Sequence, residues 1–310
     1  MPRQRLNFHI GLEKTGTTSF QRFCTAQREV LLRHSLLYPT ENLGFDSYNH
    51  QHLVDSYLDE RQLGGQASRP RRDVLASLRA QIVSSQANRI LIAGEFSSLF
   101  NDGQIESLAT DFAGFDCRIS VVVRDHRSRL ISAYCNAVVY GQWRTLDQYC
   151  DLLMRPDNRY LRYADTIAAW ERVFGRENVR VFCMSPSANV VPVLAEALIA
   201  PGIAMPNIAS RRHNVSGEHR ATEYLRHINA KLVRLPGFSR PAVRRSLTGP
   251  RRVAVQLLTR LGPRADSRPW TLDEANARRL QEISAFDAAW LKERYGVDLP
   301  PPHPRTDAFE

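Results

Sequence analysis

The sequence predicts an α/β domain of three layers, in which a central parallel sheet is flanked by helices. Short apolar runs alternate with longer amphipathic stretches, which is the pattern of strands joined by helices. The run from Ile119 to Val123 is β-branched and almost continuous, as expected of a strand that is covered on both faces. The first apolar run also leads directly into a loop rich in glycine and hydroxyl residues.

Five segments are predicted to be strands: 6–10, 36–38, 89–93, 118–123 and 179–184. Apolar residues at helical spacing follow the first strand between Phe20 and Leu31, and follow the fourth between Leu130 and Val139. Residues 270–294 form another helical pattern, which we expect to pack on the core.

The length of 310 residues is compatible with one domain, and we predict a single domain over residues 1–310 with helical insertions. Residues 236–252 are rich in glycine, proline and arginine and predict a mobile loop. No run reaches the roughly 18 apolar residues of a membrane span, and no secretory signal is evident, so we expect a cytoplasmic protein. The five cysteines are odd in number and lack CxxC spacing, which indicates neither a disulfide framework nor a zinc site.

The formal net charge of +10 favours an anionic partner. A nucleotide, an acidic acceptor, nucleic acid and a membrane surface all satisfy that charge, and so does an ordinary solvated surface. Charge alone does not choose among them.

The loop after the first strand is the most informative segment. Between Gly11 and Gly16 it contains Lys14, and three hydroxyl residues then open a helix, Thr17, Thr18 and Ser19. Glycines let backbone N–H groups turn towards an anion, and the helix start adds further donors. A plain turn capped by a threonine is the simpler interpretation.

A nucleoside-triphosphate loop, GxxxxGK[ST], is the main rival. Gly11 and Gly16 have its separation, but Thr17 occupies the lysine position and the lysine lies inside the loop, at Lys14. The segment KTGTTSFQ instead resembles the 5′-phosphosulfate loop of P-loop-type sulfotransferases, which use the activated-sulfate nucleotide PAPS. The resemblance, strongest to bacterial and carbohydrate sulfotransferases, implies that Lys14 contacts the bridging oxygen. It implies that the 5′-phosphate and sulfuryl group are held by Thr15, Gly16, Thr17, Thr18 and Ser19.

A second anchor is predicted where the fourth strand ends. Arg124 follows that strand, and Ser132 lies two helical turns further on, so the two side chains suit one phosphate. The spacing from Arg129 to Tyr134 resembles the 3′-phosphate motif of the same family, although His126 stands where many members have proline. The alternative is that Arg124 caps a helix or pairs with Asp125 at the surface, with Ser132 an ordinary residue of a polar helix face.

Sulfuryl transfer needs a base near the acceptor. Glu95 directly follows a buried strand, and several carbohydrate sulfotransferases use a glutamate at a similar strand end. Glu95 is therefore the leading candidate for the base, and the simpler interpretation is a carboxylate with a structural role. His50 and His52 are the alternative bases. Arg211 and Arg212 resemble a basic loop that closes over the nucleotide, and a solvated turn fits them equally well.

These observations predict a sulfotransferase that takes PAPS as co-substrate, needs no metal, and acts on a hydroxyl or amine. The acceptor class stays open among carbohydrate, lipid and small metabolite, and we expect no nucleic-acid partner. An ATP-dependent P-loop kinase or NTPase, and a non-catalytic nucleotide- or anion-binding protein, are the alternatives. The sequence does not indicate the oligomeric state.

Overall fold

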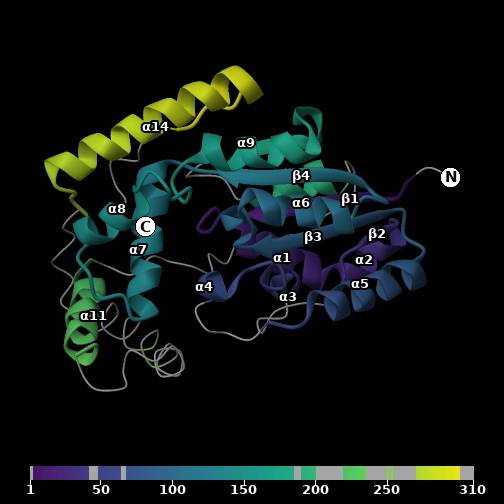
Figure 1. The fold of residues 1–310 in the computed structure, drawn as a ribbon, viewed down its shortest axis with the longest axis horizontal. Coiled ribbons are helices and arrows are strands. Elements are labelled where there is room, and N and C mark those ends of the chain that lie inside the picture. The colour runs from purple at the N-terminus through teal and green to yellow at the C-terminus, as the bar shows by residue number, and fades with distance from the viewer. Residues whose placement is uncertain are drawn as a thin grey trace. The chain divides into compact units, whose positions relative to one another are not determined.

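The computed structural model describes residues 3–41, 48–63, 68–184, 190–199, 219–234 and 270–300, together with 250 and 253 (Figure 1). The chain forms two compact units. The first, here called the sheet unit, comprises Met1–Arg124, Arg162–Arg212 and Ala288–Leu299. The second, the helical unit, comprises Asp125–Leu161, His213–Asp287 and Pro300–Glu310. The expectation of one domain over the whole length stays a prediction.

The sheet unit is built on five parallel strands in the order β2-β3-β1-β4-β5. Their bounds are Arg5–Gly11 (β1), Leu36–Leu37 (β2), Arg89–Glu95 (β3), Asp116–Val123 (β4) and Val179–Cys183 (β5). All five predicted strands form, with shifts of a few residues at their ends. The predicted three-layer α/β fold with a parallel central sheet is confirmed.

Helices cover both faces of this sheet, because alternate strand residues feed two different apolar cores. In β1, Leu6, Phe8 and Ile10 join one core, and in β3, Leu91 and Ala93 join the other. The first core includes residues of α3 (Gln51–Asp55), α5 (Arg71–Ser85), α6 (Asp102–Asp111) and α9 (Tyr163–Phe174). The second includes residues of α1 (Thr17–Ala26), α2 (Arg28–Arg33) and α10 (Val190–Leu198). Shorter elements of the sheet unit are α4 (Glu60–Leu63) and the 3₁₀ turns η1 (Ser97–Leu99) and η2 (Arg176–Asn178).

The strand order places a topological switch point between β1 and β4. The chain leaves β1 for β2 at one edge of the sheet, whereas it leaves β4 for β5 at the opposite edge. In open α/β sheets, ligands bind outside the carboxyl ends of the strands at such a point. The loop that follows Gly11 and the residue that follows Val123 both lie there.

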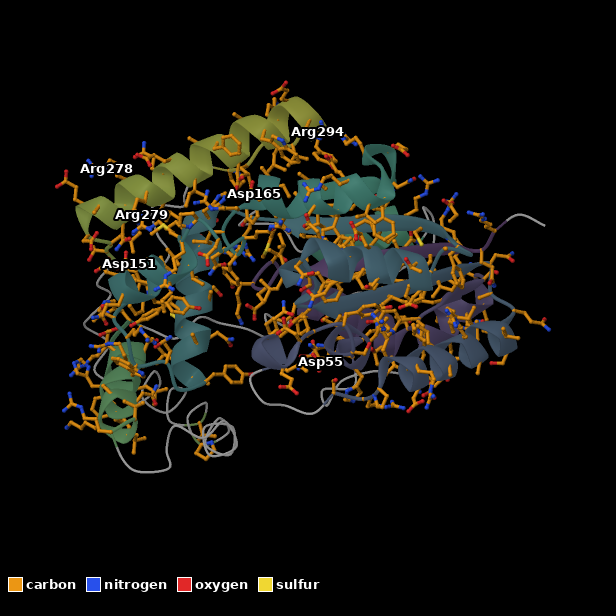
Figure 2. All side chains as sticks on the ribbon, viewed as in Figure 1. Asp55, Asp151, Asp165, Arg278, Arg279 and Arg294 are labelled. Atoms are coloured by element: carbon orange, nitrogen blue, oxygen red, sulfur yellow. The ribbon has the colours of Figure 1, made fainter. Side chains whose placement is uncertain are left out.

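The helical unit contains α7 (His126–Val139), α8 (Leu146–Leu153) and α11 (His219–Leu232), and residues 274–287 of α14 (Glu274–Tyr295). Its core joins α7 residues such as Leu130 and Tyr134 to Leu280 and Ile283 of α14. Figure 2 labels one of its ion pairs, Arg279 with Asp151, whose charged atoms are 2.8 Å apart. Helix α14 covers most of residues 270–294, so the helix predicted there is confirmed.

Residues 288–295 of α14 belong to the sheet unit, where Arg294 binds both carboxylate oxygens of the largely buried Glu171 at 2.8 Å. These contacts with a guanidinium hold the Glu171 pKa below its usual value, against the opposing effect of burial. The predicted loop over 236–252 lies outside the described residues except for residue 250. Among the residues that the structure describes, no helix is long and apolar enough to cross a membrane.

Two fully buried histidines make the sheet unit sensitive to acid. Burial lowers the pKa of His9 and of His50 to about 4. Both are therefore neutral in the folded protein, while in the unfolded chain a histidine takes up a proton near pH 6.5. The stabilisation is complete above pH 6.5 and falls as pH decreases towards 4, by about 3 kcal/mol per histidine.

We expect the free energy of unfolding, measured by denaturant titration, to fall steeply between pH 6.5 and 4. His9→Asn should make that fall shallower, because asparagine does not titrate and its amide can still bond the Ser120 hydroxyl, which lies 3.0 Å from His9 Nδ1. The same change at the exposed His34 is the control and should leave the slope unaltered. An unchanged slope in His9→Asn would contradict the assignment.

Candidate anion-binding site at the ends of strands β1, β3 and β4

The loop between β1 and α1 has the backbone of an anion cradle. Lys14 and Gly16 both adopt left-handed conformations, with φ of 66° and 78°. The buried Thr15 hydroxyl donates to the Leu12 carbonyl at 2.7 Å, which ties the loop to the end of its strand. Turns of this kind orient successive backbone N–H groups towards one point.

Helix α1 begins at Thr17, and its N-cap, Gly16, has no side chain that could cap the first N–H groups. The first N–H groups of a helix have no partner within the helix, and the helix dipole gives that end a partial positive charge. A side chain at Gly16 would be strained by the positive φ, and its Cβ would lie 2.9 Å from Val190 Cγ1. The glycine is therefore required by both conformation and space.

Arg124 connects the end of β4 to this loop. Its Nη1 donates to the Lys14 carbonyl at 2.8 Å, joining residues that are 110 positions apart in the chain. The Asp125 carboxylate, the partner in the alternative interpretation, caps α7 by accepting from the Ser128 N–H at 2.7 Å.

Tyr163 of α9 is a contributor that the sequence did not reveal. Its ring is fully buried in the core, and its hydroxyl donates to the Arg124 carbonyl at 2.8 Å. No local signal could have assigned this contact, since the two residues are 39 positions apart.

Glu95 is the last residue of β3 and lies opposite Gly11 in the register with β1. The Thr18 hydroxyl, in the first turn of α1, donates to Glu95 Oε1 at 3.0 Å. The following residue, Phe96, has a φ of 67°, so left-handed residues lie both in the loop and beside this carboxylate. The structure thus brings Lys14, Thr18, Glu95 and Arg124 to one end of the sheet.

His50 is held by the main chain rather than directed at the loop. Its Nε2 lies 3.0 Å from the Pro39 carbonyl, and its Nδ1 accepts from the Ala93 N–H at 3.1 Å. The side chain is fully buried and its pKa is lowered to about 4 by that burial. These features give His50 a structural role and argue against it as the base. His52, on α3, is partly exposed and stays a prediction.

The remaining predicted residues differ in exposure and position. Thr17 is buried and Ser19 partly exposed, both in the first turn of α1. Ser132 is a partly exposed residue of α7 in the helical unit, and its predicted contact with the 3′-phosphate stays a prediction. Arg211 and Arg212 lie outside the described residues. Within the described part of the chain, no group of three or more metal-ligating side chains gathers.

Fold and site together define a three-layer α/β protein with a candidate anion-binding loop at a switch point of its sheet. The chain matches no protein-family model and no curated protein sequence. Among solved structures it is similar to a sulfotransferase from Alicyclobacillus acidocaldarius, with 16% sequence identity and a TM-score of 0.45. That similarity covers 77% of this chain and 99% of the other. The residues of the site, rather than this similarity, support the function proposed below.

The close approach of α3 to β3 beside Glu95 can be tested by adding one methyl group. A Cβ on Gly94 would lie 2.3 Å from Val54 Cγ2, so Gly94→Ala must displace the Val54 side chain or the backbone that carries it. We expect a loss of about 1–3 kcal/mol in the free energy of unfolding.

Gly114→Ala is the matched control, because nothing lies within 4 Å of its added methyl group. Trimming the facing side chain in the double variant Gly94→Ala, Val54→Ala should cost less than the sum of the two single changes. Strict additivity would contradict the predicted clash.

Proposed function

We propose that this protein is a sulfotransferase that moves a sulfuryl group from PAPS to a hydroxyl or amine of its acceptor. The observation that carries the proposal is the meeting of Arg124 with the Lys14 loop at the switch point of the sheet. PAPS has phosphates on both its 5′ and 3′ positions, and two basic anchors on neighbouring strand ends suit such a ligand.

In the proposed reaction, the acceptor atom attacks sulfur as the bond from sulfur to the bridging oxygen breaks. Negative charge then builds on the 5′-phosphate of the leaving 3′,5′-adenosine bisphosphate. Lys14 and the N–H groups at the start of α1 stabilise this charge. The scheme requires no metal.

Glu95 is proposed to take the proton of the acceptor. It stands at a strand end beside the loop and is partly exposed, so an acceptor can reach it. The bond from Thr18 orients one carboxylate oxygen towards the loop. Arg124 and Ser132 are proposed to hold the 3′-phosphate, and Arg211 and Arg212 to cover the nucleotide.

Calorimetric titration tests the choice of nucleotide. We expect the wild-type protein to bind 3′,5′-adenosine bisphosphate more tightly than ADP or ATP with Mg²⁺. Lys14→Ala and Arg124→Ala should each weaken bisphosphate binding about 10- to 100-fold, the value of a hydrogen bond to a charged group. Arg118→Gln changes another β4 arginine, which pairs with Asp116, and serves as the control.

A preference for ATP with Mg²⁺ would contradict the proposal and favour a P-loop kinase or NTPase, since Gly11 and Gly16 also have the spacing of a triphosphate loop. Equal, strongly salt-dependent binding of all three nucleotides would instead indicate a general anion-binding protein.

The role of Glu95 is tested by Glu95→Gln, which keeps an oxygen that can accept from Thr18 but cannot take up a proton under assay conditions. With labelled PAPS and a panel of carbohydrate, lipid and small-metabolite acceptors, we expect transfer to fall about 10²- to 10⁴-fold. Bisphosphate affinity should change little. Full activity of Glu95→Gln would exclude this carboxylate as the base.

A further inference from the structure

One side chain of the site has a contact that its expected role does not explain. The resemblance to sulfotransferases implies only that Arg124 contacts the 3′-phosphate. In the structure, the Arg124 guanidinium instead donates to the main chain of the loop expected to hold the opposite, 5′ end of the nucleotide.

The acceptor of that bond is the carbonyl of Lys14, a residue whose φ of 66° lies in the region that favours glycine. A lysine adopts this conformation only where surrounding contacts hold it there. Because a peptide unit is planar and trans, its C=O and N–H groups point in opposite directions. Fixing the Lys14 carbonyl on Arg124 therefore also fixes the direction of the Thr15 N–H.

Arg124 is itself held in place through its backbone. The buried Tyr163 hydroxyl donates to the Arg124 carbonyl at 2.8 Å. The preceding residue, Val123, accepts at its carbonyl from the Met184 N–H at 2.7 Å. The guanidinium therefore extends from a backbone anchored to α9 and to the end of β5, and can serve as a brace for the loop.

We propose that Arg124 is a positioning residue of the 5′ loop in addition to a ligand of the 3′-phosphate. By holding the Lys14 carbonyl, it keeps the loop in the turn that directs its N–H groups at the 5′-phosphate. This inference rests on the proposed function and deepens it. A single guanidinium then links recognition of the 3′-phosphate to the geometry of the loop where sulfur is transferred.

The inference predicts that replacing Arg124 harms even a ligand without a 3′-phosphate. We expect Arg124→Gln to weaken binding of adenosine 5′-monophosphate about 3- to 10-fold, less than the full value of a hydrogen bond from a charged donor, because this ligand loses only the positioning of the loop. Binding of 3′,5′-adenosine bisphosphate should weaken further, because it also loses a direct contact. Arg124→Lys keeps a charged donor on a longer side chain than glutamine and should partly restore binding of the monophosphate, while Arg118→Gln should change neither affinity.

Amide hydrogen exchange of the protein without nucleotide gives an independent readout. Peptides spanning residues 12–18 should exchange at least about threefold faster in Arg124→Gln than in the wild type, because a bond that holds the loop is lost. Tyr163→Phe removes the hydroxyl that anchors Arg124 and should produce a smaller change in the same peptides. Peptides of β3 and α5 should be unaffected.

Unchanged exchange over residues 12–18 in an Arg124→Gln protein with the wild-type unfolding midpoint would overturn the positioning role, even if bisphosphate binding were lost. If Arg124→Gln does not fold, the same comparison is made with Arg124→Lys and Tyr163→Phe. Failure of the wild type to bind any adenine nucleotide would sink the proposed function separately, while the exchange experiment would still decide whether Arg124 holds the loop.

Discussion

The pairing of β1 with both β3 and β4 is the constraint on which the rest of the sheet unit depends. A strand bonded on both sides cannot shift its register without breaking two ladders. The register Gly11 opposite Glu95 therefore fixes where the loop begins relative to the carboxylate. On the other side, Ile10 pairs with Val121, so Arg124 emerges three residues beyond that level. The register of these two strand pairings therefore brings residues from three distant parts of the sequence to the carboxyl end of the sheet.

Burial on both faces gives this arrangement its rigidity. The side chains of β3 alternate between two apolar cores, those of β1 alternate between the first core and the buried polar Asn7 and His9, and helices cover each core from outside. The same burial explains the low pKa values of His9 and His50, because their charged forms would lose their hydration. A loop supported from below in this way can hold Lys14 in a left-handed conformation, a local strain that a mobile segment would relax.

The parts that sequence predicts well are those governed by local periodicity. All five strands, the helix after β4 and the C-terminal helix follow from the spacing of apolar residues. The position of Glu95 near the loop could also be predicted, because ligands of an open α/β sheet bind at the carboxyl ends of its strands. Long-range contacts were not accessible. The contacts of His50 with the Pro39 carbonyl and the Ala93 N–H, 11 and 43 positions away, and the contact of the Tyr163 hydroxyl with the Arg124 carbonyl follow from no spacing rule.

The position of the lysine gives a physical reason to favour sulfuryl transfer over triphosphate chemistry. In a GxxxxGK loop, the lysine follows the second glycine, at the start of the helix. Here that position is Thr17, whose side chain is 2% exposed in the packed first turn of α1. A lysine there would have to displace packed neighbours to reach solvent or ligand. The positive charge instead comes from Lys14, which is partly exposed within the loop and whose carbonyl is held by Arg124. The loop thus carries its lysine before the second glycine, three residues beyond Gly11, which pairs with Glu95 in the sheet.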